Sequence, residues 1–310
     1  MNDFEVQIVE LGSIASQSLF DSERFVEYQI KKGKLKYCIL QVLKKGDIVY
    51  EIAYRVQKNE AISPVRGTFS FGEIKANHLT QSEFNHIIKI LIDFQRSKGI
   101  KKWSITLPPS YYYSDFPLSL LNAFVVNTFK VENVDLNFHI DLHDNKRRQF
   151  NKTKRKILNR ALQKGHIFER VSCHNRIKEI YNIINENREK NGHKLSLSYS
   201  DLLDAHLNLP NVYEFFGLYE QQKCIAAAVC VNLGMNVAYV FYWAERYDNR
   251  HSSPVVELAY WLIDYYRNKQ CRVLDLGISS EYSLPNSGLI KFKQDLGGVM
   301  TEKMTVSIVL

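Results

Sequence analysis

The amino-acid sequence predicts an α/β protein of two related domains in tandem, each with a mixed central sheet flanked by helices. Two observations support this prediction. Residues 91–105 align without a gap on residues 262–276. The expected elements also occur twice in the same order, with meander strands followed by helix, strand, helix and strand. The repeat has the length of a domain, which distinguishes it from the short repeats of solenoid proteins.

The two aligned segments share identities as well as a pattern. Leu91, Ile92, Asp93, Arg96 and Lys98 recur as Leu262, Ile263, Asp264, Arg267 and Lys269. Each copy is typical of the end of an amphipathic helix, followed by a basic turn and a buried strand. The match predicts the same supersecondary unit at both places.

Turn and cap signals define the elements of the first half. Residues 45–47, Lys-Gly-Asp, are a turn signal between two expected strands. Thr80 and Glu83 predict a capping box at the start of a helix, and Gly99 predicts its end. The expected strands are 6–11, 37–44, 48–56, a short one following 63–72, 103–107 and 136–142, and the expected helices are 22–32, 81–98 and 118–129.

The second half begins with helices. Ser253 and Pro254 predict the N-cap and first turn of a long apolar helix. The expected helices are 151–164, 176–191, 201–207, 254–269 and 288–296, and the expected strands are 212–220, 224–233, 237–244, 271–278 and 300–309. The two domains are therefore expected to cover residues 1–145 and 146–310.

Composition restricts the class of protein. With 310 residues, 45% of them hydrophobic, the chain can form one large core or two ordinary ones, and the repeat favours two. Its net charge of +8 favours anionic partners such as phosphates, RNA or an anionic membrane surface. Residues 1–10 lack the pattern of a signal peptide, and the apolar runs are too short to span a bilayer. We therefore expect a cytoplasmic protein, and leave peripheral contact with the inner face of the membrane open. The five cysteines have no metal-ligand spacing, so we expect reduced thiols and no metal site.

Several segments carry a resemblance to a known family. The most specific is Leu289-Ile-Lys-Phe-Lys-Gln-Asp-Leu-Gly-Gly298. The others are 154–165, 185–192, Ser253-Pro254, 63–72 and 107–111. In this order and at domain spacing, they resemble the FemABX and FemAB-like proteins, the family of peptidyltransferases that build peptidoglycan interpeptide bridges. The resemblance implies two tandem GNAT-like (acyl-CoA N-acyltransferase) domains over most of the chain.

The resemblance also implies an activity, the transfer of an acyl group to a primary amine. The implied acceptor is an amino sugar or peptide on a phosphate-bearing cell-envelope precursor, with no tightly bound cofactor. The donor is acyl-CoA or aminoacyl-tRNA. The longer family members have an inserted helical hairpin that this sequence lacks, which favours acyl-CoA. The alternatives are a tRNA-dependent peptidyltransferase and a non-catalytic protein that binds anions or RNA on a degenerate GNAT scaffold.

Three residues are candidates for catalysis. Phe292 stands where many GNAT enzymes have a tyrosine general acid, and a phenylalanine cannot donate a proton. The family signature instead implies that Lys293 lies at the reaction centre, where its cation could stabilise an oxyanion. The alternative is a solvated helix lysine. Glu245 and Asp275 end central strands and could act as bases for the incoming amine, or could have structural roles.

The loop Arg250, His251, Ser252 and Ser253 is the candidate site for the donor. It lies between an expected strand and an expected helix, where backbone N–H groups favour anions. The resemblance implies that this loop binds the coenzyme A pyrophosphate. Its lack of glycine departs from the GNAT pattern, and a plain N-cap is the alternative.

Further candidates bind substrate. The resemblance implies that Arg188 contacts phosphates of the precursor, and Arg66 and Tyr111 lie in matching loops of the first half. Lys154 and Arg155 belong to a run of cations without an acid. The run is Lys146, Arg147, Arg148, Lys152, Lys154, Arg155, Lys156, Arg160 and Lys164. It could follow an RNA backbone, meet anionic lipid headgroups or be a solvated face.

Overall fold

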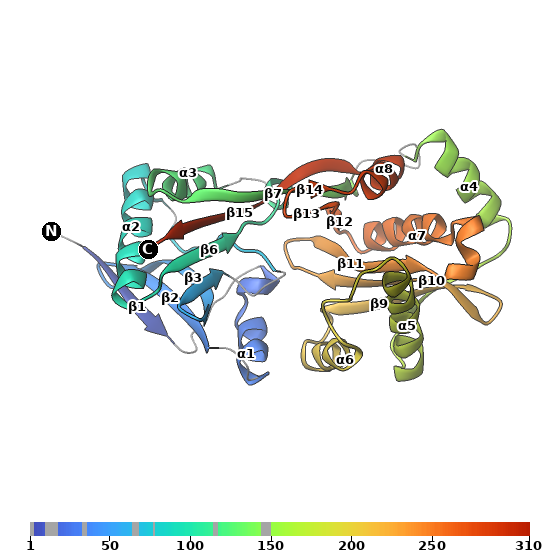
Figure 1. The fold of residues 1–310 in the computed structure, drawn as a ribbon, viewed down its shortest axis with the longest axis horizontal. Coiled ribbons are helices and arrows are strands. Elements are labelled where there is room, and N and C mark those ends of the chain that lie inside the picture. The colour runs from blue at the N-terminus through green and yellow to red at the C-terminus, as the bar shows by residue number, and fades with distance from the viewer. Residues whose placement is uncertain are drawn as a thin grey trace. The chain divides into compact units, whose positions relative to one another are not determined.

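The computed structural model describes residues 3–9, 18–32, 36–63, 68–76, 78–113, 117–143 and 150–310 (Figure 1). The chain divides into two compact units. The first comprises Met1–Asp135 together with Glu302–Leu310, and the second comprises Leu136–Thr301. The bounds of these units differ from the expected domains, 1–145 and 146–310.

The first unit is a mixed sheet with helices. Its strand order is β1-β2-β3-β4-β6-β15, with β5 paired to β3. The elements are β1 (Phe4–Val9), η1 (Leu19–Asp21), α1 (Glu23–Lys31), β2 (Lys36–Lys44), β3 (Asp47–Gln57), β4 (Glu60–Ser63), β5 (Glu73–Ile74), α2 (Gln81–Ser97), β6 (Lys102–Thr106), η2 (Ser110–Tyr112) and α3 (Leu118–Val126). The predicted capping box is present, because Thr80 accepts the Glu83 N–H while Glu83 accepts that of Thr80.

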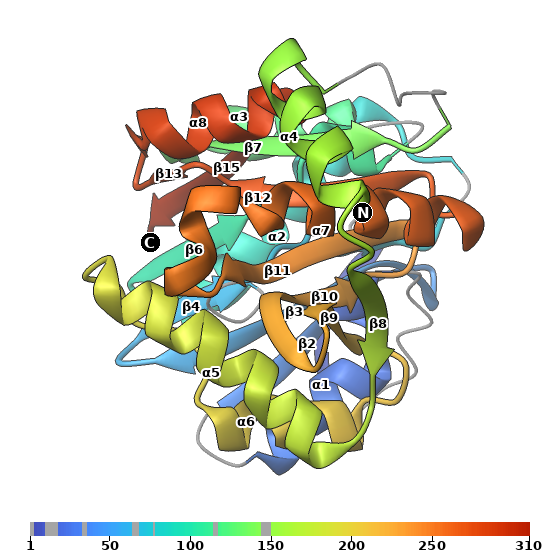
Figure 2. The same cartoon turned by 90° about the vertical axis from the view of Figure 1, so that its right-hand side faces the viewer.

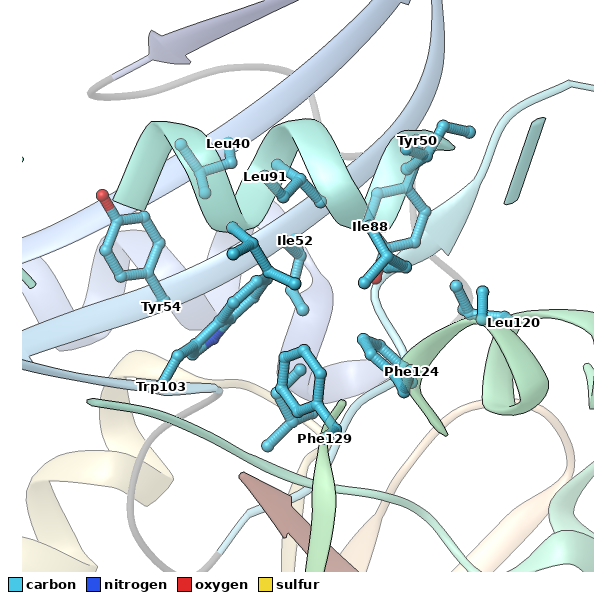
Figure 3. Close-up of a cluster of buried hydrophobic side chains, with 14 of the residues drawn as sticks. Leu40, Tyr50, Ile52, Tyr54, Ile88, Leu91, Trp103, Leu120, Phe124 and Phe129 are labelled. Carbon is cyan, nitrogen blue, oxygen red and sulfur yellow. The ribbon is translucent and has the colours of Figure 1, made fainter. Parts of the chain in front are cut away.

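The core of the first unit lies between its sheet and helices α2 and α3. Figure 3 shows Ile88 and Leu91 of α2 and Trp103 of β6 among the buried side chains of this core. Trp103 makes an edge-to-face contact with Phe129, with ring centroids 5.6 Å apart. These side chains are almost fully buried, as the alternation of apolar residues in the sequence predicts.

The second unit has the strand order β7-β12-β11-β10-β9-β8. Its elements are β7 (Lys130–Asp141, which begins in the first unit), α4 (Lys152–Leu162), β8 (Ile167–Val171), α5 (His174–Lys190), α6 (Tyr199–Asn208), β9 (Tyr213–Glu220), β10 (Lys223–Asn232), β11 (Val237–Glu245), η3 (Tyr247–Ser252), α7 (Pro254–Asn268), β12 (Val273–Ile278), β13 (Ser280–Glu281), β14 (Leu284–Pro285) and α8 (Ser287–Asp295). Strand β15 (Val299–Val309) follows, and from Glu302 on it belongs to the first unit. Helices α4, α7 and α8 cover one face of this sheet, and α5 and α6 cover the other (Figures 1 and 2). In the described part of the chain, no helix combines the length and hydropathy needed to cross a bilayer.

The internal repeat is visible in the backbone. Helix α2 joins the parallel strands β4 and β6, just as α7 joins the parallel strands β11 and β12. The turns after the two helices match in detail. Gly99 and Gln270 occupy equivalent positions and have φ of 75° and 59°. The next residue of each turn donates its N–H to the helix, Ile100 to Gln95 O at 3.1 Å and Cys271 to Tyr266 O at 3.0 Å.

The last strands of the two halves lie in other units than the expected domain bounds imply. The predicted strand 136–142 is the end of β7, and it pairs with β12 in the second unit. The predicted strand 300–309 is β15, and Thr305–Val309 pairs with β6 in the first unit. A division at residue 145 places 136–142 in the first domain and 302–309 in the second, whereas the compact units contain them the other way round. The apolar pattern identifies a buried strand but carries no information about its neighbour.

The prediction lacked four strands, β4, β8, β13 and β14. β8 is an edge strand whose Ile167, Glu169 and Arg170 are exposed, so its apolar pattern is weak. It pairs with β9 and completes the meander before α7.

Candidate active site

The site lies in the second unit, where β11 and β12 part. Their parallel ladder covers Val237–Tyr239 and Val273–Asp275, whereas the strands continue to Glu245 and Ile278. A bulge in β11 accompanies the divergence, since Val240 lies opposite Cys230 but Tyr242 lies opposite Val229. The extra residue shifts the alternation of side chains, and this brings Trp243 onto the core beside α7 and α8.

Asp275 and Gly277 form a sharp turn within β12. One carboxylate oxygen of the buried Asp275, Oδ1, accepts the Gly277 N–H at 2.6 Å and the Asn137 side-chain amide at 2.9 Å. Gly277 has φ of 77°, and a Cβ there would lie 3.2 Å from the Tyr239 ring. Only glycine adopts this conformation without strain. The predicted base Asp275 thus shapes the strand end through these two hydrogen bonds.

Lys293 of α8 reaches this turn. Its Nζ donates to the carbonyl oxygens of Gly277 and Ile278, each at 2.8 Å. The side chain is 2% exposed, and its ammonium lies 5.8 Å from the centroid of the Phe138 ring. The interpretation of Lys293 as a solvated helix lysine is therefore wrong. The structure places a lysine where two strands separate, held by backbone carbonyls.

The end of α8 fixes the position of Lys293. The helix closes with a Schellman motif, in which Gly297 N donates to Gln294 O at 2.8 Å and Gly298 N to Lys293 O at 2.9 Å. A Cβ on Gly298 would lie 2.8 Å from that same Lys293 oxygen. The paired glycines at 297 and 298 in the C-terminal segment thus hold the backbone of the lysine.

The surroundings of Lys293 change its acidity. Burial lowers the pKa of the ammonium to about 7, because the charged form loses its hydration. Asp275 opposes this shift, and the guanidinium of Arg188 adds to it. Lysine with such a pKa exchanges protons near neutral pH, as a catalytic acid or base must.

Arg188 and Tyr239 complete this cluster. Arg188 lies in the last turn of α5, and its positive charge lowers the pKa of both Lys293 and Tyr239. Burial, with Asp275 second, raises the pKa of Tyr239, which therefore stays neutral. Of the predicted residues, Asp275 and Lys293 both bond to Gly277, and the charge of Arg188 acts on Lys293.

Glu245, a candidate for either a base or a structural role, lies at the start of α7. Its Oε2 accepts the Val255 N–H at 3.4 Å, so a carboxylate covers the start of α7. Burial raises the pKa of Glu245, while the Val255 N–H, Arg250 and Lys154 oppose the shift. Ser253, the predicted cap, has φ of 49° and makes no side-chain cap hydrogen bond. The helix start is thus occupied by a carboxylate of the protein itself.

The loop before α7 is the 3-10 helix η3. Its polar groups bond to one another, with Ser252 Oγ donating to Asn249 O at 2.9 Å and Ser253 N donating to Arg250 O at 3.1 Å. The Arg250 guanidinium stacks on the Tyr247 ring at 4.9 Å, and His251 Nδ1 is 3.2 Å from Asp248 O. Arg250 and His251 are exposed, so both can meet a ligand at the surface.

Helix α4 carries the described part of the basic run. Asn151 caps it by accepting the Lys154 N–H at 2.8 Å, and its amide also donates to Asp295 of α8 at 2.6 Å. Lys154 lies over the Phe292 ring at 4.9 Å. Arg155 is exposed. The helix therefore starts next to the residue that precedes Lys293. The exposed cations of the helix and the turn after it are Lys152, Arg155, Lys156, Arg160 and Lys164.

Two predicted substrate contacts belong to the first unit. Tyr111 lies in η2, half-buried, with its ring edge-to-face on Tyr112. Arg66 lies outside the described residues, as do Lys146, Arg147 and Arg148 of the basic run.

Sequence reasoning missed Asn137, Tyr239 and Gly277. All three are defined by cross-strand neighbours that the sequence does not reveal. Gly277 gave the one local signal, a glycine inside an apolar strand directly after an aspartate, which favours a bulge.

Solved structures share this fold. FemX is 13% identical over 98% of this chain and 97% of that chain, with a TM-score of 0.71. A tandem GNAT protein from the clavulanic acid biosynthesis pathway is 8% identical over 98% of both chains, with a TM-score of 0.59. The C-terminal domain of a putative lysylphosphatidylglycerol synthetase from Agrobacterium fabrum is 13% identical over 84% of this chain and 81% of that one, with a TM-score of 0.56. No protein-family model and no curated protein sequence matches the chain.

The fold is therefore that of tandem GNAT proteins, and it is similar to FemX over nearly the whole chain. At these identities, the likeness concerns the fold alone.

Proposed function

We propose that the protein is an N-acyltransferase that moves an aminoacyl group from tRNA to a primary amine, with Lys293 at the reaction centre. The main observation in support is the buried Lys293 ammonium, which donates to the Gly277 and Ile278 carbonyls where β11 and β12 part. A buried lysine costs stability unless it has partners, and its retention at a strand divergence suggests chemical use.

The proposed step uses Lys293 as a proton relay. With a pKa of about 7, neutral Lys293 can take a proton from the attacking amine while its own N–H groups remain on the two carbonyls. The amine nitrogen forms a bond to the ester carbonyl carbon. The resulting ammonium stabilises the oxyanion and then returns the proton to the departing hydroxyl oxygen as the C–O bond breaks. The products are an amide and a free hydroxyl.

The start of α7 bears on the choice of donor. A coenzyme A pyrophosphate would need free N–H groups at that helix start, but Glu245 already accepts the Val255 N–H. A second anion there would meet a carboxylate. This disfavours acyl-CoA, the donor that the sequence suggested, and favours an ester whose phosphates lie farther away.

Helix α4 supports aminoacyl-tRNA as that ester. Its exposed cations continue from Lys154, beside Phe292, along the helix and so provide a basic path to the site. A protein of similar fold is named for a lysylated lipid, which is an aminoacyl product.

For the acceptor, Arg188, whose charge acts on Lys293, suits a ligand with phosphate or carboxylate groups. A cell-envelope precursor with a peptide amine, used at the inner face of the membrane, fits this chemistry.

The donor can be tested by equilibrium binding. We expect aminoacylated tRNA to bind with strong salt dependence and acetyl-CoA to give no heat in calorimetry. Saturable binding of acetyl-CoA at the start of α7, without binding of tRNA, would overturn the choice of donor.

A further inference from the structure

Helix α3 of the first unit is apolar on both of its faces. Its inner face packs on the core through Leu120 and Phe124, which Figure 3 shows among the buried side chains. Its outer face is apolar as well, because Leu118 is 67% exposed and Val125 and Val126 are each 55% exposed. None of its nine residues is charged. A helix that is apolar all round is normally buried, so the outer face of α3 indicates a binding partner.

The fold does not require an apolar outer face at this place. In the order of the internal repeat, α3 follows β6 just as α8 follows β12, and both helices have nine residues. The outer face of α8 is charged and polar, since Lys291 and Gln294 are exposed and Lys291 pairs with Asp295 at 3.3 Å. The apolar outer face is therefore a property of α3 and not of the repeat.

Two exposed lysines lie at the C-terminal end of α3. Lys130 begins β7 directly after the turn that ends the helix, and Val131 beside it is 52% exposed. Lys89 lies on α2, one turn beyond Asn85, whose carbonyl oxygen accepts the side-chain amide of the α3 C-cap Asn127 at 3.1 Å. Positive charge thus borders one end of the apolar face.

The acids near these lysines already have other partners. Glu132 pairs with Lys102, and Asp93 pairs with Arg96 at 3.2 Å. In the described part of the chain, neither Lys89 nor Lys130 forms an ion pair. Their charge is therefore available to an anionic partner.

The size of the face separates a lipid surface from a protein partner. A nine-residue helix is about 14 Å long, so its outer face offers a few hundred Å² at most. A stable protein interface buries about 800 Å² on each partner. A bilayer surface needs less apolar area, because anionic headgroups add an attraction to nearby cations.

We propose that the outer face of α3, together with Val131, Lys89 and Lys130, docks the protein on an anionic lipid surface. The apolar side chains enter the boundary between headgroups and acyl chains, while the two lysines contact the headgroups. The inference is independent of the proposed transfer reaction, because it concerns the first unit and uses neither Lys293 nor α4.

Vesicle flotation of the full chain tests the docking without tRNA or acceptor. The probes are vesicles of phosphatidylcholine alone and of phosphatidylcholine and phosphatidylglycerol in a ratio of about 7:3. We expect the wild type to float with the mixed vesicles and to bind phosphatidylcholine alone at least about tenfold more weakly. Replacing Lys89 and Lys130 with Gln should weaken binding to the mixed vesicles by about fivefold for each lysine at low salt.

Two triple variants locate the apolar contact. Replacing Leu118, Val125 and Val126 with Ser should abolish flotation with the mixed vesicles. The matched control replaces Ile167, Leu207 and Leu284 with Ser, three apolar residues of the second unit with comparable exposure. It should float as the wild type does. Because all six side chains are exposed, both variants should keep the circular dichroism and the melting temperature of the wild type.

Failure of the wild type to float with the mixed vesicles would overturn the proposal, as would equal flotation of the two triple variants. Light scattering in the absence of lipid tests the other occupant of the face. A wild-type dimer that the α3 variant converts to a monomer would overturn the proposal in favour of a second copy of the chain. Flotation without any transfer activity would leave the docking surface intact and count only against the proposed function.

Discussion

The Lys293 ammonium lies 2.8 Å from the carbonyl oxygen of Gly277, the residue whose positive φ turns the end of β12. A kink made by Asp275 and Gly277 thus provides the acceptor that a buried lysine requires. The contact between Lys293 and Gly277 joins α8 to β12, and the short hairpin of β13 and β14 lies between these two elements in the sequence.

Stability should depend on pH through Lys293. Its folded pKa of about 7 lies below its ordinary value of 10.5, so the unfolded chain binds the proton more tightly between these limits. Stability should therefore rise with pH across this window, by up to about 1.4 kcal/mol per pH unit. Urea unfolding of the wild type and Lys293→Met at pH 7, 8 and 9 measures the effect. An equal pH dependence in both proteins would show that Lys293 is not the titrating group.

Asp275→Asn should move the pH–rate profile. Asp275 raises the pKa of Lys293, so removal of its charge should lower that pKa and shift the midpoint of the rate below pH 7. The amide can still bond to Asn137 or Gly277, which limits structural damage. Transfer rates from pH 5 to 9 give the midpoint. A shift to higher pH would mean that Asp275 does not act through its charge on Lys293.

The exposed cations of α4 should carry the salt dependence of tRNA binding. Replacing Lys152, Arg155 and Lys156 with Glu should reduce the slope of log K against log salt by about 2 to 3. The control is the same charge change at Lys89, Arg96 and Lys98, exposed residues of α2 and its C-cap. Filter binding across salt concentrations measures both slopes. If the salt slope falls equally in the two triple variants, α4 contributes only through the net charge of the protein and not as a binding surface.

The internal repeat predicts opposite effects on stability for substitutions at the two equivalent turn positions, Gly99 and Gln270. Gly99 has φ of 75° with open space around its Cα, so Gly99→Ala should cost about 1 kcal/mol from the backbone alone. Gln270 has φ of 59° at the equivalent position, so Gln270→Gly should be neutral or stabilise by a few tenths of a kcal/mol. Thermal or urea unfolding tests the pair. Destabilisation by Gln270→Gly as large as that by Gly99→Ala would mean that the two turns are not equivalent.

Local signals explain what the sequence could predict. The capping box of Thr80 and Glu83 and the glycine after α2 place that helix within a residue or two, because caps act over one turn. Lys293 was found through the resemblance of its segment. Its burial was not predictable, since the Gly277 and Ile278 carbonyls approach it only after α8 packs beside β12. The pairing of β7 with β12 and of β15 with β6 likewise depends on neighbours distant in sequence. The same is true of the hydrogen bond between Glu245 and Val255 N.

The most direct test of the central claim measures transfer itself. Radiolabelled aminoacyl-tRNA is incubated with a lysine-containing peptide and with the wild type, Lys293→Arg or Lys293→Met, and the labelled amide is counted. The wild type should form the amide. Lys293→Met should bind tRNA normally and lose at least about a hundredfold in rate, the contribution of a positioned acid or base. Lys293→Arg should lose as much, because arginine keeps the charge but cannot accept a proton. Wild-type rates in Lys293→Met, or transfer from acetyl-CoA but not from charged tRNA, would contradict the account.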